Sequence, residues 1–450
     1  MRNHRDGEYL ITYQPIKALL IFALPILIGN IFQQIYQMVD SIVVGRLVSQ
    51  NALAAIGASA ALTNIFICLA VGAGLGASVL TGRYFGARNY KKMKEIISTA
   101  MICFLIFSIF LGLLGLFFSK ELLILLNTPD QVLGMAAVYL KVYFAGFPFL
   151  FMYNVFSSTF NAMGKSEVPL AMLIFSSILN VILDLVMVGP MQMGVFGAAL
   201  ATLIAQGISA VLSFIILVHD LKGYESGSFS YFSGGEAKEM LALAVPSMIQ
   251  QSTVAIGMLL VQSVVNSFGA EALAGYSAAV RVENIAFVPL TSMASAFSSY
   301  VAQNLGAGQK KRIIKGFQAG FAVDIVFALL ILFVMEVFPG RLIDLFLGEG
   351  GTALARQTAI GYMSFLGFFF LILGLKTLAD SVLRGMGFVK VFLIANLVNL
   401  GIRVLAAFTL APHFGIQVIW QVVPIGWTVG FLISFTGYLK KKKELQLDRE

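Results

Sequence analysis

The chain has 450 residues, of which 59% are hydrophobic and only 12% are charged, and its formal net charge is +8. A soluble globular domain contains about 25% charged residues, so this composition excludes a soluble protein. The excess of positive charge does not indicate a nucleic-acid partner, because no basic stretch is interleaved with aromatic residues on a soluble face.

Apolar runs of about 20 residues recur along the chain, and each is long enough to cross ~30 Å of hydrocarbon. The first run lasts about 25 residues, too long for the apolar part of a signal peptide, so we expect it to be retained as a helix. Cys68 and Cys103 lie inside such runs and indicate neither a disulfide framework nor a metal site. Twelve spans are predicted, at about residues 17–42, 54–80, 94–118, 132–156, 168–189, 195–218, 240–266, 274–302, 314–338, 355–378, 388–411 and 416–439.

One polar, glycine-rich connection divides these spans into two sets of six. We expect an N-terminal lobe over 1–218, a linker over 219–239 and a C-terminal lobe over 240–450. Lysine and arginine are several times more frequent in the connections on the side that holds both termini. The positive-inside rule therefore predicts a multi-pass protein of the plasma (inner) membrane with both termini in the cytoplasm.

The two halves of the sequence repeat. Ala23-Leu24-Pro25 matches Ala244-Val245-Pro246, and GRYFGARNYKK at 82–92 aligns with AQNLGAGQKKR at 302–312. Because each half has an even number of spans, both halves begin on the same side, so the repeats are parallel and related by an axis along the membrane normal. The predicted fold is an all-α polytopic membrane protein with two six-helix lobes that rock around a central cavity.

A group of oxygen-bearing side chains interrupts the apolar runs of the first half. Asn180 and Asp184 are four residues apart and share one face of a helix, Thr202 lies in the next run and Asp40 in the first. A charged carboxylate at membrane depth costs at least ~2.5–3.5 kcal/mol and persists only with a partner or a cation. Carboxylate, amide and hydroxyl oxygens are ligands that can bind Na⁺. Two carboxylates close together cannot both ionise cheaply, so the pKa of one rises and the pair can instead hold a proton. The alternative interpretation is a hydrogen-bond network that only holds helices together.

The second half does not repeat this group. At the repeat offset, Arg403 corresponds to Asn180 and Ala407 to Asp184, so a cation site is expected in one half only. Arg403 is either a substrate or gate residue or, more simply, a paired structural charge. Glu283 in the eighth span is the second candidate for cation coupling.

Several other features of the sequence carry separate predictions. Lys376 and Asp380 are spaced to neutralise one another on a helix, whereas Asp324 has no evident partner in the sequence. MGKS at 163–166 ends like a phosphate-binding loop but lacks its leading glycine and lies between spans. The glycines of 72–76 lie within a span and predict close helix packing. No nucleotide-binding domain is expected.

Four features of the sequence resemble the multidrug and toxic compound extrusion (MATE) family. They are QMVDSIVVGRL at 37–47, GRYFGARN at 82–89, VLRGMG at 382–387 and the arrangement of Asn180, Asp184 and Thr202. The resemblance spans essentially the whole chain, including its six-plus-six organisation. It implies a cation-coupled antiporter that exports organic cations or amphipathic drugs through a V-shaped pair of lobes.

The resemblance also assigns roles to particular residues. In one branch of the family, the N-lobe cation site uses an acid on the first helix, Asn and Asp on the fifth and Thr on the sixth. These roles fall here on Asp40, Asn180, Asp184 and Thr202. Another branch relies on acids of the C-lobe, and neither Glu283 nor Asp380 clearly matches its positions.

The resulting hypothesis is an antiporter that takes up Na⁺ or H⁺ and exports amphipathic, cationic small molecules. We expect its substrate cavity to include Gln33, Tyr36, Glu283 and Arg403. The expected partners are these small molecules and membrane lipids, with no cofactor, nucleotide or nucleic acid, and the chain is expected to act as a monomer. A lipid-linked oligosaccharide flippase of the same superfamily is the alternative. A receptor or a membrane-embedded enzyme is less consistent with the sequence, which contains no HExxH motif and no exposed nucleophile–base pair.

Overall fold

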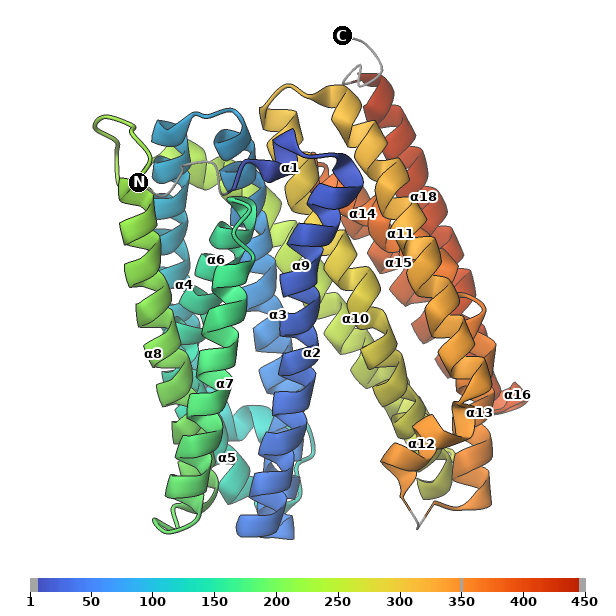
Figure 1. The fold of residues 1–450 in the computed structure, drawn as a ribbon. Coiled ribbons are helices and arrows are strands. Elements are labelled where there is room, and N and C mark those ends of the chain that lie inside the picture. The colour runs from blue at the N-terminus through green and yellow to red at the C-terminus, as the bar shows by residue number, and fades with distance from the viewer. Residues whose placement is uncertain (1–6, 349–350, 445–450) are drawn as a thin grey trace. The chain divides into compact units, whose positions relative to one another are not determined.

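The computed structural model describes residues 7–348 and 351–444, apart from the side chains of residues 40, 41, 44, 46, 47, 50 and 444. All regular secondary structure within these ranges is helical (Figure 1). The first half contains α1 (Tyr9–Thr12), α2 (Pro15–Leu47), α3 (Gln50–Gly86), α4 (Tyr90–Leu125), α5 (Asp130–Ala145), α6 (Phe147–Ala162), α7 (Glu167–Val188) and α8 (Gly194–Lys222). The second half contains α9 (Gly234–Asn266), α10 (Ala270–Gly306), α11 (Lys310–Val337), α12 (Pro339–Leu347), α13 (Ala353–Gly367), α14 (Phe370–Gly385), α15 (Val389–Thr409), α16 (Ala411–Phe414), α17 (Gln417–Gln421) and α18 (Val423–Glu444).

The described helices bear out an all-α polytopic membrane fold. Ten helical segments are long and apolar enough to cross a membrane, and the number rises to 12 if each of two bent helix pairs counts as one span. These pairs are α5 with α6, bent by 50°, and α13 with α14, bent by 58°. The sequence predicted one span at each place, at about residues 132–156 and 355–378. Gly146 and Pro148 explain the first bend, because proline has no N–H to continue the helical ladder and its ring crowds the preceding turn.

The internal repeat is visible in the order and length of the helices. Helices α2 and α9 both have 33 residues and an internal proline, Pro25 and Pro246 respectively. Helices α3 and α10, which follow them, both have 37 residues. In each half the bent pair is the fourth span. The two halves of the chain are therefore similar in whole helices as well as in short sequence matches.

The helices pack into two compact units. Unit 1 comprises Met1–Tyr9 and Ile28–Ser252, and unit 2 comprises Leu10–Leu27 and Thr253–Glu450. The sequence predicted lobes over 1–218 and 240–450, and the two units differ from these lobes in two segments. The beginning of α2 groups with unit 2, and the linker with the beginning of α9 groups with unit 1.

Specific contacts explain both differences. Met240, Ala244 and Met248 of α9 are buried in the hydrophobic core of unit 1. The chain just before α2 is held within unit 2 by Arg312, whose Nη2 donates to the carbonyl oxygens of Leu10 (3.1 Å) and Tyr13 (2.6 Å). Neither set of contacts follows from hydrophobic periodicity, because each joins segments that are far apart in the sequence.

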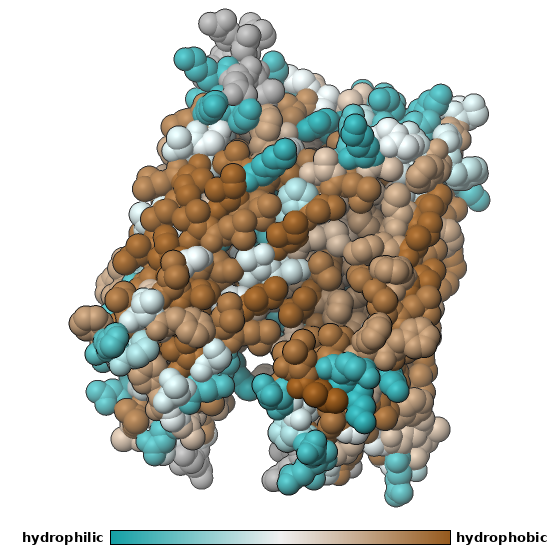
Figure 2. All heavy atoms as spheres, turned by 180° about the vertical axis from the view of Figure 1, so that it is seen from behind, coloured by the Kyte–Doolittle hydropathy of each residue, from teal (hydrophilic) through white to brown (hydrophobic). Residues whose placement is uncertain are grey.

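Large apolar side chains cover the flanks of the helices. Figure 2 shows this apolar surface on one face, with hydrophilic side chains gathered toward the helix ends. On α4, the side chains of Phe117 and Leu125 are each 76% exposed. Exposed apolar side chains over whole helices are costly in water and favourable in lipid, so this surface agrees with the membrane assignment.

The glycines predicted to allow close packing do so within unit 1. A Cβ atom added to Gly76 of α3 would lie 2.2 Å from the Cα of Ala244, and one added to Gly72 would lie 2.5 Å from the Cα of Met248. Gly74 lies against α6, where an added Cβ would be 2.4 Å from Ser158 Oγ. The glycines therefore let α3 approach two different helices.

Gly76→Ala is expected to lower the stability of the protein by about 1–3 kcal/mol, the usual cost of overpacking a core. The control is Gly57→Ala on the same helix, where an added Cβ meets nothing within 4 Å. Replacing that glycine should be neutral or stabilising by up to about 1 kcal/mol. Thermal unfolding in detergent measures both, and equal effects of the two substitutions would contradict the close contact between α3 and α9.

Candidate cation site

Helix α7 buries one polar face. Its buried residues are Ser177, Asn180, Asp184 and Val188, which recur every three or four positions. The positions between them are apolar and either exposed, for example Ile182 at 52%, or half-buried. This helix therefore presents apolar side chains outward and encloses its carboxylate. That is the arrangement required for a charged group at membrane depth.

Asn180 lies at the centre of a hydrogen-bond network that joins three helices of unit 1. Its side-chain amide is oriented so that each atom meets a partner of the opposite kind. The amide nitrogen then donates to Asp184 Oδ2 (3.0 Å) and to the hydroxyl of Tyr36 on α2 (3.2 Å). The amide oxygen accepts from the backbone N–H of Thr202 on α8 (3.1 Å). Asn180 and Asp184 are almost fully buried, at 1% and 0% exposure.

Thr202 completes the network from α8. Its hydroxyl lies 3.2 Å from the Asn180 amide and 3.1 Å from the carbonyl oxygen of Ala198, one turn earlier on its own helix. Helices α7 and α8 pack side by side along their length, which brings the two side chains together (Figure 1). Three of the predicted residues, Asn180, Asp184 and Thr202, are thus neighbours.

Three of the predicted residues, Asp40, Tyr36 and Gln33, lie on α2. The side chain of Asp40 is outside the described residues, so its role stays a prediction. Tyr36, placed by the sequence only in a substrate cavity, contacts Asn180 directly. The sequence signal that finds it is its position one turn before Asp40 on the same helix face. Gln33, one turn earlier still, is exposed.

The Asn180 amide can present two different faces to Asp184. In the orientation above, its nitrogen links the carboxylate to the tyrosine hydroxyl. Turned by 180°, the nitrogen donates instead to Thr202 Oγ1 at 3.2 Å. The amide oxygen then faces Asp184 and Tyr36, and oxygens from three side chains converge. Amide, carboxylate and hydroxyl oxygens are the ligands that hard cations prefer.

A second polar cluster lies within unit 2. The hydroxyl of Tyr362 on α13 donates to Glu283 Oε2 on α10. Arg403 of α15 is close enough to interact electrostatically with that carboxylate. The Tyr362 ring packs against Tyr276 and Trp420, with centroids 5.6 Å and 5.5 Å away. Glu283 and Arg403 therefore belong to one neighbourhood, and Arg403 has a carboxylate nearby to offset its charge.

The predicted pairing of Lys376 with Asp380 is confirmed, within a larger network. Lys376 Nζ lies 2.7 Å from Asp380 Oδ2 and donates to Asn396 Oδ1 at 2.8 Å. Asn396 Nδ2 donates to the same Asp380 oxygen (3.1 Å), and the Ser434 hydroxyl donates to the other. Every charge in this network has a partner, as is needed for a buried ion pair to be tolerated. Asp324 differs, because its Oδ1 is buried with no hydrogen-bond partner among the described residues.

A fold of repeated helical spans, with ionisable side chains turned inward at membrane depth, defines a polytopic membrane transporter. The MatE family model matches residues 25–186 and 246–409, one segment in each half of the chain. The chain therefore belongs to the MatE family, a family of multidrug transporters and not of enzymes.

Individual relatives agree with this assignment. The chain is 29% identical over 386 residues to the probable multidrug resistance protein YpnP of Bacillus subtilis, and the match covers 85% of each chain. It is 26% identical over 453 residues to the probable multidrug resistance protein YoeA of the same organism, covering 96% of this chain and 95% of the relative. A solved structure of a MOP superfamily transporter from Pyrococcus furiosus superposes with a TM-score of 0.90 over 99% of both chains at 23% identity. That likeness shows the fold alone.

Proposed function

We propose that this chain is a multidrug efflux antiporter that exchanges Na⁺ or H⁺ for amphipathic, cationic small molecules. Membership of the MatE family and the multidrug names of two relatives support the export of drugs. The observation that carries the coupling role is the buried carboxylate of Asp184, which shares the Asn180 amide with Tyr36 and Thr202. A network built only to hold helices together does not need a charge, and a carboxylate is costly there.

The proposed coupling step is a reorientation of the Asn180 amide. Without the ion, the amide nitrogen donates to Asp184 and Tyr36 and holds α2 against α7. When Na⁺ enters, the amide turns its oxygen toward the ion beside the carboxylate, and Thr202 accepts the released N–H. A proton acts at Asp184 more directly, because the protonated carboxyl becomes a donor. In both cases the link between α2 and α7 changes, so the ion biases the packing of unit 1.

The proposed orientation places the protein in the plasma (inner) membrane with both termini in the cytoplasm, as the distribution of lysine and arginine indicates. The ion then enters from outside, down its electrochemical gradient. We keep Glu283 and Arg403 as candidate substrate contacts in unit 2, with Tyr36 and Gln33 as candidates in unit 1. The oligosaccharide flippase alternative gains no support from the relatives reported above.

Export by purified protein in liposomes tests this function. A Na⁺ gradient and a pH gradient are imposed in separate experiments. One of the two should make a fluorescent cationic dye accumulate against its own gradient. The gradient that drives accumulation identifies the ion. If neither gradient moves the dye, or if only ATP does, the proposal is wrong.

Tyr36→Phe should weaken ion coupling without abolishing it. Removing one hydroxyl from an ion or carboxylate typically costs about 1.5 kcal/mol, which corresponds to a roughly tenfold higher ion concentration at half-maximal rate. Transport measured against ion concentration gives this value. The control is Tyr231→Phe, a tyrosine that is 72% exposed in the linker. An unchanged ion dependence in Tyr36→Phe would remove Tyr36 from the site.

A further inference from the structure

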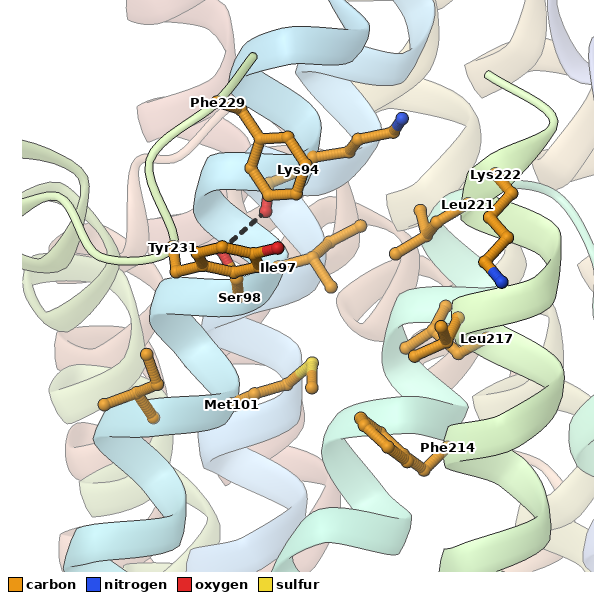
Figure 3. Close-up of a pocket in the computed structure, with 12 residues that line it drawn as sticks. Lys94, Ile97, Ser98, Met101, Phe214, Leu217, Leu221, Lys222, Phe229 and Tyr231 are labelled. Atoms are coloured by element: carbon orange, nitrogen blue, oxygen red, sulfur yellow. Dashed lines mark hydrogen bonds between the residues drawn. The ribbon is translucent and has the colours of Figure 1, made fainter. Parts of the chain in front are cut away.

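A pocket of unit 1 lies away from the candidate cation site, on the side of the linker. It has a volume of about 410 Å³ and is bounded by α4, α8 and the linker segment that contains Phe229 and Tyr231 (Figure 3). Its walls are apolar, and Ile97 and Met101 of α4 face Phe214 and Leu217 of α8 across it. Pockets of this size hold small ligands or part of a larger one.

The linker is fixed against α4 and forms one wall of this pocket. The backbone N–H of Ser230 donates to Glu95 Oε1 (3.3 Å), and that of Ser233 donates to Thr99 Oγ1 (3.1 Å). The Phe229 and Tyr231 rings contact one another at 5.2 Å. Tyr231 nevertheless stays 72% exposed. An exposed aromatic ring at the end of a membrane span is typical of the membrane–water interface.

Two lysines stand where the apolar walls end. Lys94 lies at the beginning of α4 and Lys222 at the end of α8. Lys94 Nζ donates to the carbonyl oxygen of Tyr224 (2.6 Å) and lies over the Phe229 ring (5.7 Å). Among the residues that the structure describes, neither lysine has an ion-pair partner, and none of the residues lining the pocket is acidic.

Two carboxylates that adjoin these lysines in the sequence, Glu95 and Asp220, do not line the pocket. Glu95 accepts the N–H of Ser230, and Asp220 forms an ion pair with Lys165. The pocket therefore combines a positive rim with an apolar interior. A cationic drug, the substrate proposed above, would be repelled by this rim. A free phosphate would satisfy the lysines but would leave the apolar walls unused.

We propose that this pocket binds an anionic phospholipid, with the phosphate between Lys94 and Lys222 and part of an acyl chain against Met101 and Phe214. Basic pockets between membrane helices at the interface have this chemistry, and each lysine near an anionic lipid surface contributes about 1 kcal/mol. Because the linker forms a wall, a bound lipid and the ordered linker stabilise one another. The site is separate from the cation site and does not depend on it.

Native mass spectrometry of the purified full chain tests this proposal, with phosphatidylglycerol and phosphatidylcholine as probes. The wild-type protein should retain phosphatidylglycerol preferentially. Lys94→Gln with Lys222→Gln should weaken that binding about 30-fold, which is the combined effect of two lysines. The control pair is Lys91→Gln with Lys238→Gln, which removes the same charge from exposed lysines outside the pocket. It should leave binding within about twofold of wild type.

Two further variants separate the parts of the site. Lys94→Arg with Lys222→Arg keeps the charge and should retain phosphatidylglycerol. Met101→Trp keeps both lysines but fills the apolar interior, and should weaken binding at least tenfold while leaving binding of inorganic phosphate unchanged. If the Lys94/Lys222 and Lys91/Lys238 double variants lose phosphatidylglycerol binding equally, the lipid is attracted to basic surface in general and the proposal is overturned. Full binding by Met101→Trp, or no preference for phosphatidylglycerol in the wild type, would also overturn it.

Discussion

Asp184→Asn should abolish the accumulation of substrate against its gradient while leaving the protein folded. One-for-one exchange of a monovalent ion for a monovalent cation moves no net charge, so the concentration gradient of the ion drives export. A roughly 50-fold ion gradient, worth about 2.3 kcal/mol, can therefore sustain a roughly 50-fold substrate gradient. Asparagine has nearly the shape of aspartate and can still hydrogen-bond with the Asn180 amide. It cannot hold a cation by charge or exchange a proton. The expected result is therefore a substrate gradient that falls from about 50-fold to none.

The measurement is dye accumulation in liposomes, together with exchange of dye across the membrane at equal concentrations. Exchange without a gradient should persist in Asp184→Asn, because it needs no coupling ion. The matched control is Ser177→Ala, which alters another buried polar residue on the same face of α7. Accumulation by Asp184→Asn at the wild-type level would show that this carboxylate does not couple transport.

Asp380→Asn should destabilise unit 2 by about 3–5 kcal/mol, because it leaves the Lys376 ammonium buried without its counter-charge. The two side chains are only 5% and 9% exposed, so water can offset little of this cost. Thermal unfolding in detergent, measured alongside the wild type, gives the loss. This result is expected if the ion pair of Lys376 and Asp380 stabilises the fold and takes no direct part in transport.

The double variant Lys376→Met with Asp380→Asn should recover most of the lost stability. It removes both charges. The oxygen of the new amide can still accept from Asn396, and its nitrogen can donate to the Ser434 hydroxyl, which can act as donor or acceptor. A double variant no more stable than the single one would contradict the ion-pair explanation. Loss of export in Asp380→Asn with unchanged stability would instead assign Asp380 a direct role in transport.

The sequence predicted which polar residues of α7 and α8 lie together in the candidate cation site, because these residues are close along the chain. Asn180 and Asp184 are one helical turn apart, and Thr202 lies on the next helix, which packs against the first. An ionisable residue within an apolar run is also conspicuous. The participation of Tyr36 could not be predicted with the same precision, because it depends on how α2 packs against α7.

Features that depend on contacts over long distances in the sequence were not predicted. The i, i+4 spacing predicted the contact between Lys376 and Asp380, but Asn396 and Ser434 come from two later helices. The linker was identified by its polarity, and its packing against α4 was not, because single hydrogen bonds to Glu95 and Thr99 leave no periodic signal. Hydrophobic periodicity reports which face of a helix is buried, but not which helix covers it.

The surroundings of Asp324 could not be predicted from the sequence either. Its carboxyl lies against Gly374 of α14, where an added Cβ would be 3.2 Å from the Cβ of Asp324, and no sequence pattern connects the two. The glycine leaves room for the carboxyl group without offering it a hydrogen bond.

The most direct test of the central claim is the release of an ion when substrate binds. Purified protein loaded with ²²Na⁺ in weakly buffered solution is mixed with a cationic dye, and displaced Na⁺ and released H⁺ are recorded together. An ion bound at Asp184 predicts release of one kind of ion by the wild type and by the control Ser177→Ala, and none by Asp184→Asn. Equal release by the wild type and Asp184→Asn would contradict the account.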